Sequence, residues 1–141
     1  MEGGRIEERW LPGMLARAWR PGRGFWAAEL REGGAFAGWF HLFEVEGEPA
    51  AVELGYRLRR AVWGRGLATE GSRALVALAF AEPAVERVTA KALTTNAASI
   101  RVMVKLGMSP AGHGEYRGLP EAHYAVERAT WSAVTAGMTR R

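Results

Sequence analysis

The sequence predicts an α/β fold whose mixed β-sheet begins as an antiparallel meander and continues through a strand–helix–strand crossover. Three segments rich in apolar and aromatic residues, 25–30, 36–45 and 51–58, are separated by short turns that contain glycine, which is typical of consecutive antiparallel hairpins. A helical segment, 67–80, then separates the third strand from a fourth, 86–92. Such a crossover predicts parallel pairing of these two strands, and helices are expected on both faces of the sheet.

The elements before the crossover follow from periodicity and turn residues. An amphipathic helix is expected over residues 7–20, because apolar residues there recur at spacings near three and four. Its first turn is weakened by Pro12 and Gly13, and residues 21–24 end it. The hairpin turns of the meander are expected at residues 32–34 and 46–49.

Two helices are expected after the meander. Residues 67–80 form the most regular of them, and Pro83 lies beyond its end. A shorter helix is expected to be capped by Thr95 or Asn96 and to end near Gly107, which occupies a position that favours a left-handed residue.

Two further strands should complete the sheet. The first begins at Met108 and is interrupted by glycines, so its length is not defined by the pattern. The second covers residues 123–128, after Pro120. Residues after Trp131 suggest a helical or frayed tail. Neither a linker nor an internal repeat occurs, so residues 1–141 are expected to form a single domain.

Composition and charge exclude several classes of function. A length of 141 residues, 48% apolar and 24% charged, is ordinary for one soluble globular domain. The absence of cysteine excludes disulfides and zinc–thiolate sites and fits the cytoplasm. No apolar run reaches membrane-spanning length, and the N-terminal residues do not form a signal peptide. The formal net charge of +4 leaves a nucleic-acid-binding domain as an alternative that is supported by charge alone.

The turn before the segment 67–80 is the strongest local indication of a ligand site. Gly64 and Gly66 let the backbone approach a ligand closely, and the following helix start adds free N–H groups and partial positive charge, which suits phosphate. The turn lacks the Lys-Ser/Thr of a Walker loop and the glycine spacing of a dinucleotide fingerprint. A plain strand-to-helix turn is the alternative explanation.

A second group of polar residues lies at the start of the shorter helix. Asn96 and Ser99 are one turn apart, and Arg101 and Lys105 share a helix face. By themselves these four residues fit helix capping and a solvated basic face as well as they fit a binding site.

Taken together, three segments resemble the GNAT superfamily of N-acetyltransferases, and in particular the branch of the ribosomal-protein N-terminal acetyltransferases (RimJ/RimL-like). The segments are 53–58, 63–70 and 96–108, and the resemblance covers about residues 25–128. It implies a GNAT-like mixed sheet. It also implies transfer of an acetyl group from acetyl-CoA, without a metal, to the primary amine of a protein N-terminus or a small molecule, by direct attack in a ternary complex.

The resemblance also implies how acetyl-CoA is bound. The superfamily's pyrophosphate loop, Gln/Arg-x-x-Gly-x-Gly/Ala, corresponds to Trp63-x-x-Gly66-x-Ala68, in which the tryptophan removes one expected phosphate contact. The strand that ends at Leu58 would pair with the pantetheine arm, and Asn96 would hydrogen-bond that arm. The residues expected to bind the cofactor are Tyr56, Arg57, Leu58, Arg60, Trp63, Gly64, Arg65, Gly66, Leu67, Ala68, Thr69, Asn96, Ser99, Arg101 and Lys105.

The reaction needs a base for the proton of the amine and a donor for the oxyanion. In this superfamily a backbone N–H of the strand that corresponds to residues 53–58 supplies the donor, and Glu53 is the carboxylate on that strand, so we expect it to be the base. A solvent-facing strand glutamate is the alternative. Met103 stands where many members carry a tyrosine that protonates the departing thiolate, so Ser99, Tyr116 or water is expected to take that role.

The N-terminus departs from the resemblance. The family normally opens with a strand and a helix before the segment that corresponds to residues 7–20, which implies a shortened N-terminus and a homodimer that completes the sheet edge. Trp26 and Trp39 are candidates for lining the acceptor cleft. The alternative to an enzyme is a catalytically silent acyl-CoA-binding or regulatory module, which Met103 and the shortened N-terminus favour.

Overall fold

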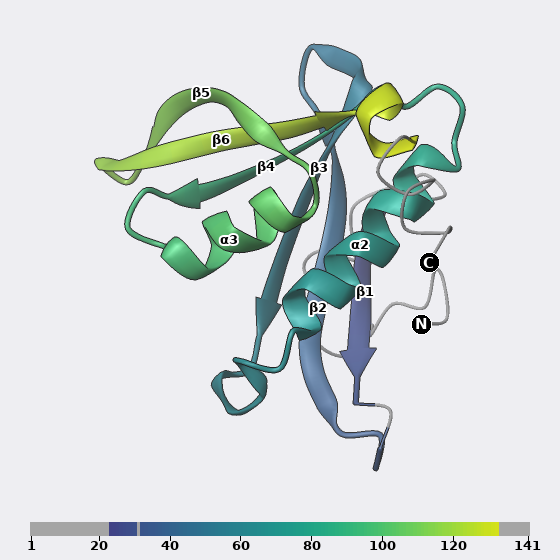
Figure 1. Cartoon of the computed structure of the whole chain (residues 1–141), viewed down its shortest axis with the longest axis vertical. Coiled ribbons are helices and arrows are strands. Elements are labelled where there is room, and N and C mark those ends of the chain that lie inside the picture. The colour runs from purple at the N-terminus through teal and green to yellow at the C-terminus, as the bar shows by residue number, and fades with distance from the viewer. Residues whose placement is uncertain (1–22, 31, 133–141) are drawn as a thin grey trace.

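The computed structural model describes residues 23–30 and 32–132, and they form a six-stranded mixed sheet with its helices (Figure 1). The strand order is β1-β2-β3-β4-β6-β5. The helix predicted over residues 7–20 lies outside the described residues. The elements are β1 (Gly24–Glu29), β2 (Phe36–Val45), β3 (Glu48–Leu58), the 3-10 helix η2 (Arg60–Val62), α2 (Leu67–Phe80), β4 (Arg87–Leu93), α3 (Ala97–Lys105), β5 (Ser109–Tyr116) and β6 (Leu119–Glu127).

The predicted order of strand pairing is confirmed. β1, β2 and β3 form an antiparallel meander, and β3 pairs in parallel with β4 across the α2 crossover. Two strand starts were predicted too late, because β3 begins at Glu48 and β6 at Leu119. Pro120 therefore lies inside β6. It is tolerated because the last residue of β4 pairs with Glu121, so the missing N–H of Pro120 falls beyond the β4 ladder.

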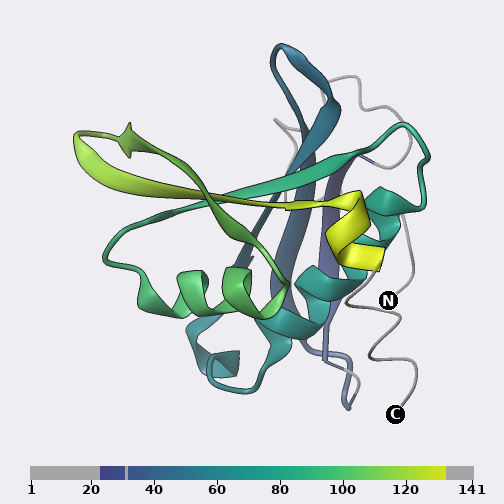
Figure 2. The ribbon, with the colours of Figure 1, turned by 45° about the horizontal axis from the view of Figure 1, so that its top comes forward.

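The core lies between the sheet and the two helices, which cover the same face (Figure 2). Phe40 and Leu42 of β2 face α2, and the close approach depends on Gly71, because a Cβ at that position would overlap the Phe40 ring. Trp26 is 2% exposed within this core, so the expectation that it lines an acceptor cleft is wrong. Among residues 23–30 and 32–132, no helix is long and apolar enough to cross a bilayer.

The opposite face of β1 and β2 carries a cluster of rings. Phe25 packs edge-on against Trp39, His41 and Phe43, with ring centroids 6.3, 5.6 and 5.2 Å away. The His41 ring stacks on Phe43 at 4.1 Å. Alternation along the strand therefore places Trp39 and His41 on the face that α2 does not cover.

Arg128, directly after β6, fastens the end of α2 to the sheet. Its guanidinium donates hydrogen bonds to the carbonyl oxygens of Phe80 at 3.0 Å and Glu82 at 2.7 Å, and it lies over the Phe80 ring. Cations are favoured at helix C-termini, where carbonyls lack partners.

We expect Arg128→Ala to lower the free energy of unfolding by about 2 kcal/mol, measured by urea denaturation. Arg87→Ala, which breaks an exposed ion pair, should cost about 0.5 kcal/mol or less. Equal losses in the two variants would contradict this role.

Candidate active site

The sheet opens between β3 and β4. The two strands pair at only three positions, from Ala51–Arg87 to Glu53–Thr89, although β3 continues to Leu58 and β4 to Leu93 (Figure 1). Beyond Glu53, the edge of β3 that faces β4 has no strand partner within residues 23–30 and 32–132. Backbone N–H and C=O groups on such an edge can pair with an extended ligand. The split therefore presents free backbone groups of the kind with which an extended ligand pairs.

A cavity of about 590 Å³ fills this split. It combines backbone from β3 with polar side chains from β2, β4, β5 and β6 and with residues of both helices. Its lining residues are His41, Glu53, Leu54, Gly55, Tyr56, Arg57, Ser72, Ala90, Lys91, Leu93, Ser99, Val102, Met103, Leu106, Glu115, Tyr116 and Glu121. The structure thus brings Glu53, Ser99 and Tyr116, the three predicted catalytic residues, to one cavity.

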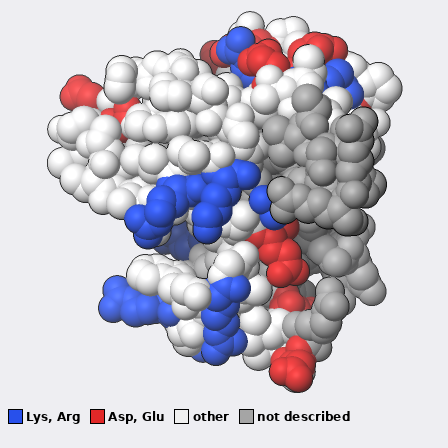
Figure 3. Space-filling view, viewed as in Figure 1, with Lys and Arg blue, Asp and Glu red and all other residues white. Residues whose placement is uncertain are grey.

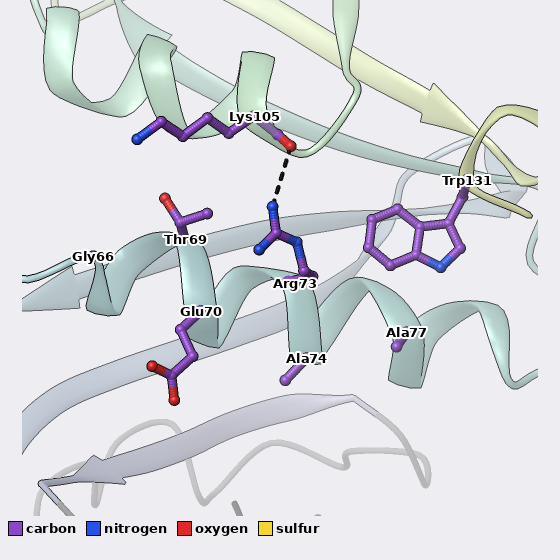
Figure 4. Close-up of a pocket in the computed structure, with 8 residues that line it drawn as sticks. All are labelled: Gly66, Thr69, Glu70, Arg73, Ala74, Ala77, Lys105 and Trp131. Atoms are coloured by element: carbon purple, nitrogen blue, oxygen red, sulfur yellow. Dashed lines mark hydrogen bonds between the residues drawn. The ribbon is translucent and has the colours of Figure 1, made fainter. Parts of the chain in front are cut away.

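A second groove of about 760 Å³ runs between α2 and α3. Gly66, Thr69 and Arg73 line it from α2, and Lys105 lines it from α3. Figure 4 shows the Arg73 guanidinium beside the Lys105 backbone carbonyl, while the Lys105 side chain extends toward the Gly66 end of α2 and the Glu70 carboxylate points to the other side. Arg73 Nη2 donates to the Lys105 carbonyl oxygen at 3.5 Å. The groove therefore offers two cations beside a helix start.

That helix start supplies donors for an anion. Gly66 is the N-cap of α2 with φ 75° and ψ 8°, and no side chain caps the first turn. Gly64 is also left-handed, with φ 79°. The N–H groups of the first turn of a helix have no partner inside it, and they carry the positive end of the helix dipole. Leu67, Ala68 and Thr69, the first residues of α2, accordingly present backbone donors of the kind that hold anions in other proteins.

Positive charge gathers beside the groove between α2 and α3 on this side of the molecule. Figure 3 shows Lys and Arg side chains gathered over α3 and around η2 and the turn before α2. Arg60, Arg65, Arg101 and Lys105 are exposed. Such a field raises the local concentration of anionic ligands. Arg101 does not line either cavity, whereas Lys105 does.

Two hydroxyl groups meet inside the split. Tyr56 Oη and Ser99 Oγ are 3.2 Å apart. Burial raises the pKa of Tyr56 above its ordinary value, and the hydrogen bond to Ser99 opposes this in part. Tyr56 therefore remains a protonated phenol at neutral pH. Met103, 5% exposed, lies in the same cavity and has no proton to give.

The start of α3 is fixed by its predicted cap. Asn96 Oδ1 accepts a hydrogen bond from the Ser99 N–H at 3.1 Å, so Asn96 rather than Thr95 is the N-cap. This bond occupies the Asn96 oxygen and leaves its amide N–H₂ as the group that could donate to a ligand.

Two of the acidic side chains that line the split, Glu53 and Glu121, are paired. Glu53 Oε1 lies 3.2 Å from Lys91 Nζ, and its side chain is 28% exposed. Glu121 Oε1 lies 3.0 Å from His123 Nε2. Tyr116 is 51% exposed at the tip of the β5–β6 hairpin. No group of three or more His, Asp or Glu side chains within residues 23–30 and 32–132 is placed to hold a metal ion.

Several predicted cofactor residues lie outside both cavities. Trp63 is 61% exposed, and its Nε1 donates to the Leu58 carbonyl oxygen at 3.0 Å. The Arg60 guanidinium lies 5.4 Å from the centre of the Trp63 ring. The side chain of Trp63 thus stabilises the turn through its hydrogen bond to Leu58. Gly64 and Gly66, which follow it, have no side chain and leave the backbone of the turn accessible. The predicted residues that line neither cavity are Leu58, Arg60, Trp63, Gly64, Arg65, Leu67, Ala68, Asn96 and Arg101.

Similarity to known proteins identifies the family of the chain. The acetyltransferase (GNAT) domain family matches residues 5–109. The chain belongs to the GNAT acetyltransferase family. It is 31% identical over 126 residues to FsC-acetyl coenzyme A-N(2)-transacetylase of Aspergillus fumigatus, covering 79% of this chain and 53% of that protein. It is 36% identical over 88 residues to YkkB, an uncharacterized protein of Bacillus subtilis, covering 62% of this chain and 51% of that one. The chain thus spans about half the length of these relatives.

Solved GNAT structures share the fold. Aminoglycoside acetyltransferase AAC(6')-Ib, in complex with coenzyme A, matches with a TM-score of 0.73 and 23% identity over 91% of this chain and 78% of that one. A GNAT-family acetyltransferase of Bacillus anthracis matches with a TM-score of 0.66 and 24% identity over 73% of this chain and 65% of that one. At these identities the likeness shows the fold alone.

The predicted site residues leave out several polar residues of the two cavities, among them Arg73, Ser72 and His41. Arg73 lies one turn after Thr69 on the same helix face, so helical periodicity could have predicted that it lines the same groove. Ser72 is fully buried, and its hydroxyl has no hydrogen-bond partner. His41 lies over Gly55 of β3, at a point where a Cβ would overlap its ring. No sequence pattern identified His41 or Ser72.

The burial of His41 gives the fold a dependence on pH. Burial lowers the pKa of His41 from 6.5 to about 4. Between these values the unfolded chain binds a proton that the folded chain does not, so the free energy of unfolding must fall as the pH drops from 6.5 to about 4. We expect His41→Phe to lose this part of the dependence in urea titrations at several pH values. An unchanged slope in the variant would contradict the burial effect.

Proposed function

We propose that the chain is an N-acetyltransferase of a single domain, residues 1–141, which transfers the acetyl group of acetyl-CoA to a primary amine by direct attack in a ternary complex. The observation that carries this proposal is the split after Glu53, because it offers an unpaired strand edge that leads directly to the uncapped start of α2. Acetyl-CoA is an extended molecule with amides along its arm and phosphates at one end.

The described residues fit that cosubstrate part by part. The β3 edge over residues 54–58 suits the amides of the pantetheine arm. The first turn of α2 suits the pyrophosphate, and Arg73 and Lys105 suit a further phosphate in the groove between the helices. The thioester would then lie near the start of the split, beside Glu53.

The proposed chemistry uses groups near that point. A backbone N–H of β3 just beyond Glu53 would stabilise negative charge on the carbonyl oxygen. Glu53 remains a candidate for the base, either directly or through water, although it is paired with Lys91. Ser99 and Tyr116 remain candidates for the proton donor. Ser99 has the better placement, since it already shares a hydrogen bond with Tyr56 inside the cavity.

The proposal includes two classes of acceptor, and a solved structure that shares the fold supports the first of them. AAC(6')-Ib has been solved with coenzyme A and kanamycin, an aminoglycoside. The carboxylates of Glu115 and Glu121 in the cavity lining suit an acceptor that arrives as an ammonium ion. A protein N-terminus is the other class, and with it we propose membership of the RimJ/RimL-like branch. The proposal further includes a cytoplasmic location and a homodimer, for which the exposed edge strand β5 offers a surface.

One experiment tests the function. Calorimetry with acetyl-CoA should give saturable binding, and a thiol-release assay should show turnover with at least one member of a panel of aminoglycosides, polyamines and peptides. The absence of acetyl-CoA binding would overturn the proposal.

A silent acyl-CoA-binding module is the second candidate, and Met103 is the observation that favours it. This side chain fills the position at which many family members place a proton-donating tyrosine. A thiol leaves readily near neutral pH, so the donor is dispensable for an active enzyme. Binding of acetyl-CoA without thiol release from any amine of the panel would identify the silent module.

A further inference from the structure

One nitrogen base in the split has no hydrogen-bond partner among the described residues. His41 lines the cavity together with Glu53 and Gly55. Its Nδ1 is buried without a hydrogen-bond partner, and no hydrogen bond to either ring nitrogen occurs among residues 23–30 and 32–132. A buried nitrogen without a partner costs stability, so such a group calls for an explanation beyond folding.

The position of the ring is set by backbone geometry. His41 pairs with Gly55 across the β2–β3 ladder, and the ring lies where a side chain at Gly55 would be. Gly55 is two residues beyond Glu53, the last β3 residue that pairs with β4. The ring therefore lies over the first part of the split, on the face that α2 does not cover. Stacking on Phe43 and edge contact with Phe25 hold it there.

The carboxylates and phenols that line the cavity either have a partner in the protein or are exposed to solvent. Glu53 is paired with Lys91, and Glu121 with His123. Tyr56 shares its hydroxyl with Ser99. Glu115 and Tyr116 are exposed on the β5–β6 hairpin.

We propose that His41 is a catalytic residue that takes the proton from the acceptor amine as this amine attacks the thioester in the β3–β4 split. This proposal rests on the proposed function. It gives Glu53 a different role, that of drawing the cationic acceptor to the site and stabilising the imidazolium that forms. His41, Gly55 and Glu53 then act at one point, on the side of the sheet opposite to the basic groove.

The step balances. The amine nitrogen forms a bond to the carbonyl carbon, the C–S bond breaks, and the proton of the amine passes to an imidazole nitrogen. From there it moves to the departing sulfur, so that the products are an amide and a free thiol. An acceptor that arrives as an ammonium ion releases one proton to water before the attack. The imidazole returns to its neutral form.

The electrostatic surroundings allow this cycle. Burial keeps the imidazole neutral at the pH of the reaction, so its lone pair is free. Of the groups that face it, β1 contributes the uncharged Phe25, and β3 contributes Glu53 and Arg57. Lys91, Glu115 and Glu121 line the cavity from β4, β5 and β6. A neutral base in a partly closed cavity is what proton abstraction requires.

Two variants test the assignment in the full-length chain. His41→Phe keeps an aromatic ring against Phe25 and Phe43 but removes the base, and His41→Ala leaves a space that free imidazole can enter. We expect His41→Phe to lower kcat about 100-fold or more while the Kd for acetyl-CoA changes less than about threefold. Imidazole added to His41→Ala should restore turnover in proportion to its neutral form. A purely structural role for His41 would not produce this rescue.

The outcomes separate cleanly. A kcat for His41→Phe within about threefold of wild type would overturn the role of His41 and leave the proposed function intact. A loss in His41→Ala that imidazole does not rescue would also overturn it. If His41→Phe does not fold, the imidazole response of His41→Ala decides. Acetyl-CoA binding by the wild-type chain without thiol release from any amine would instead overturn the enzyme assignment, and the role of His41 with it.

Discussion

Replacing Gly38 with alanine should unfold much of the population. Gly38 lies in β2 with φ 144°, and a Cβ at this position would overlap the carbonyl oxygen of Arg57 in the neighbouring strand. Because the obstacle is backbone, it cannot move away as the end of a side chain can. Forced backbone strain and overpacking together should cost about 3–5 kcal/mol, which is a large part of the stability of an ordinary domain.

Gly47→Ala is the matched control for this prediction. Gly47 has φ 79°, and no atom lies within 4 Å of the position of an added Cβ, so only the left-handed conformation is penalised. That penalty should be about 1–2 kcal/mol. Urea denaturation of the two variants gives the comparison, and similar losses would show that the β2–β3 approach is not as close as described.

Removing both cations of the groove between α2 and α3 should have the largest effect on cofactor binding. Arg73 and Lys105 lie together beside the start of α2. A hydrogen bond to a charged group contributes about 1.5–3 kcal/mol, so Arg73→Gln with Lys105→Gln should weaken coenzyme A binding by about 100-fold or more. Calorimetry at low and high salt measures this, and the salt dependence of the Kd should decrease in the double variant.

Arg87→Gln provides the control for charge. Arg87 pairs with Glu127 and lines neither cavity, so its loss lowers the net charge without touching the groove. A double variant that binds coenzyme A within about threefold of wild type would show that the phosphates lie elsewhere.

The sequence was sufficient for α2 and α3, for the antiparallel meander and for the parallel pairing of β3 with β4. The predicted bounds of α2, 67–80, match the structure, because helical periodicity and the glycine before it mark both ends. The polar and glycine positions of α2 and α3 likewise indicated an anion site, since helix starts carry their donors wherever the chain is folded. These features depend on residues close to one another in the sequence.

The position of His41 depended on register, which the sequence does not specify. Val45 pairs with Glu48 at the hairpin turn, but the next pair is Glu44 with Val52, so β3 carries three extra residues at a bulge. Without the bulge, a simple hairpin would place His41 opposite Val52 instead of Gly55. An odd shift also exchanges the two faces of a strand. The composition of this hairpin contains no clear indication of the bulge. The sequence therefore could not predict that His41, the proposed base, lies at the β3–β4 split.

Hydrogen–deuterium exchange with and without acetyl-CoA tests the central claim most directly, because it reports on the split itself. The account predicts slower exchange for two groups of amides, those of residues 54–58 that point toward β4 and those of Leu67, Ala68 and Thr69 at the start of α2. Amides in the β1–β2 ladder should not change. Saturable binding of acetyl-CoA that leaves both groups unprotected would contradict the claim that the cosubstrate occupies the β3–β4 split.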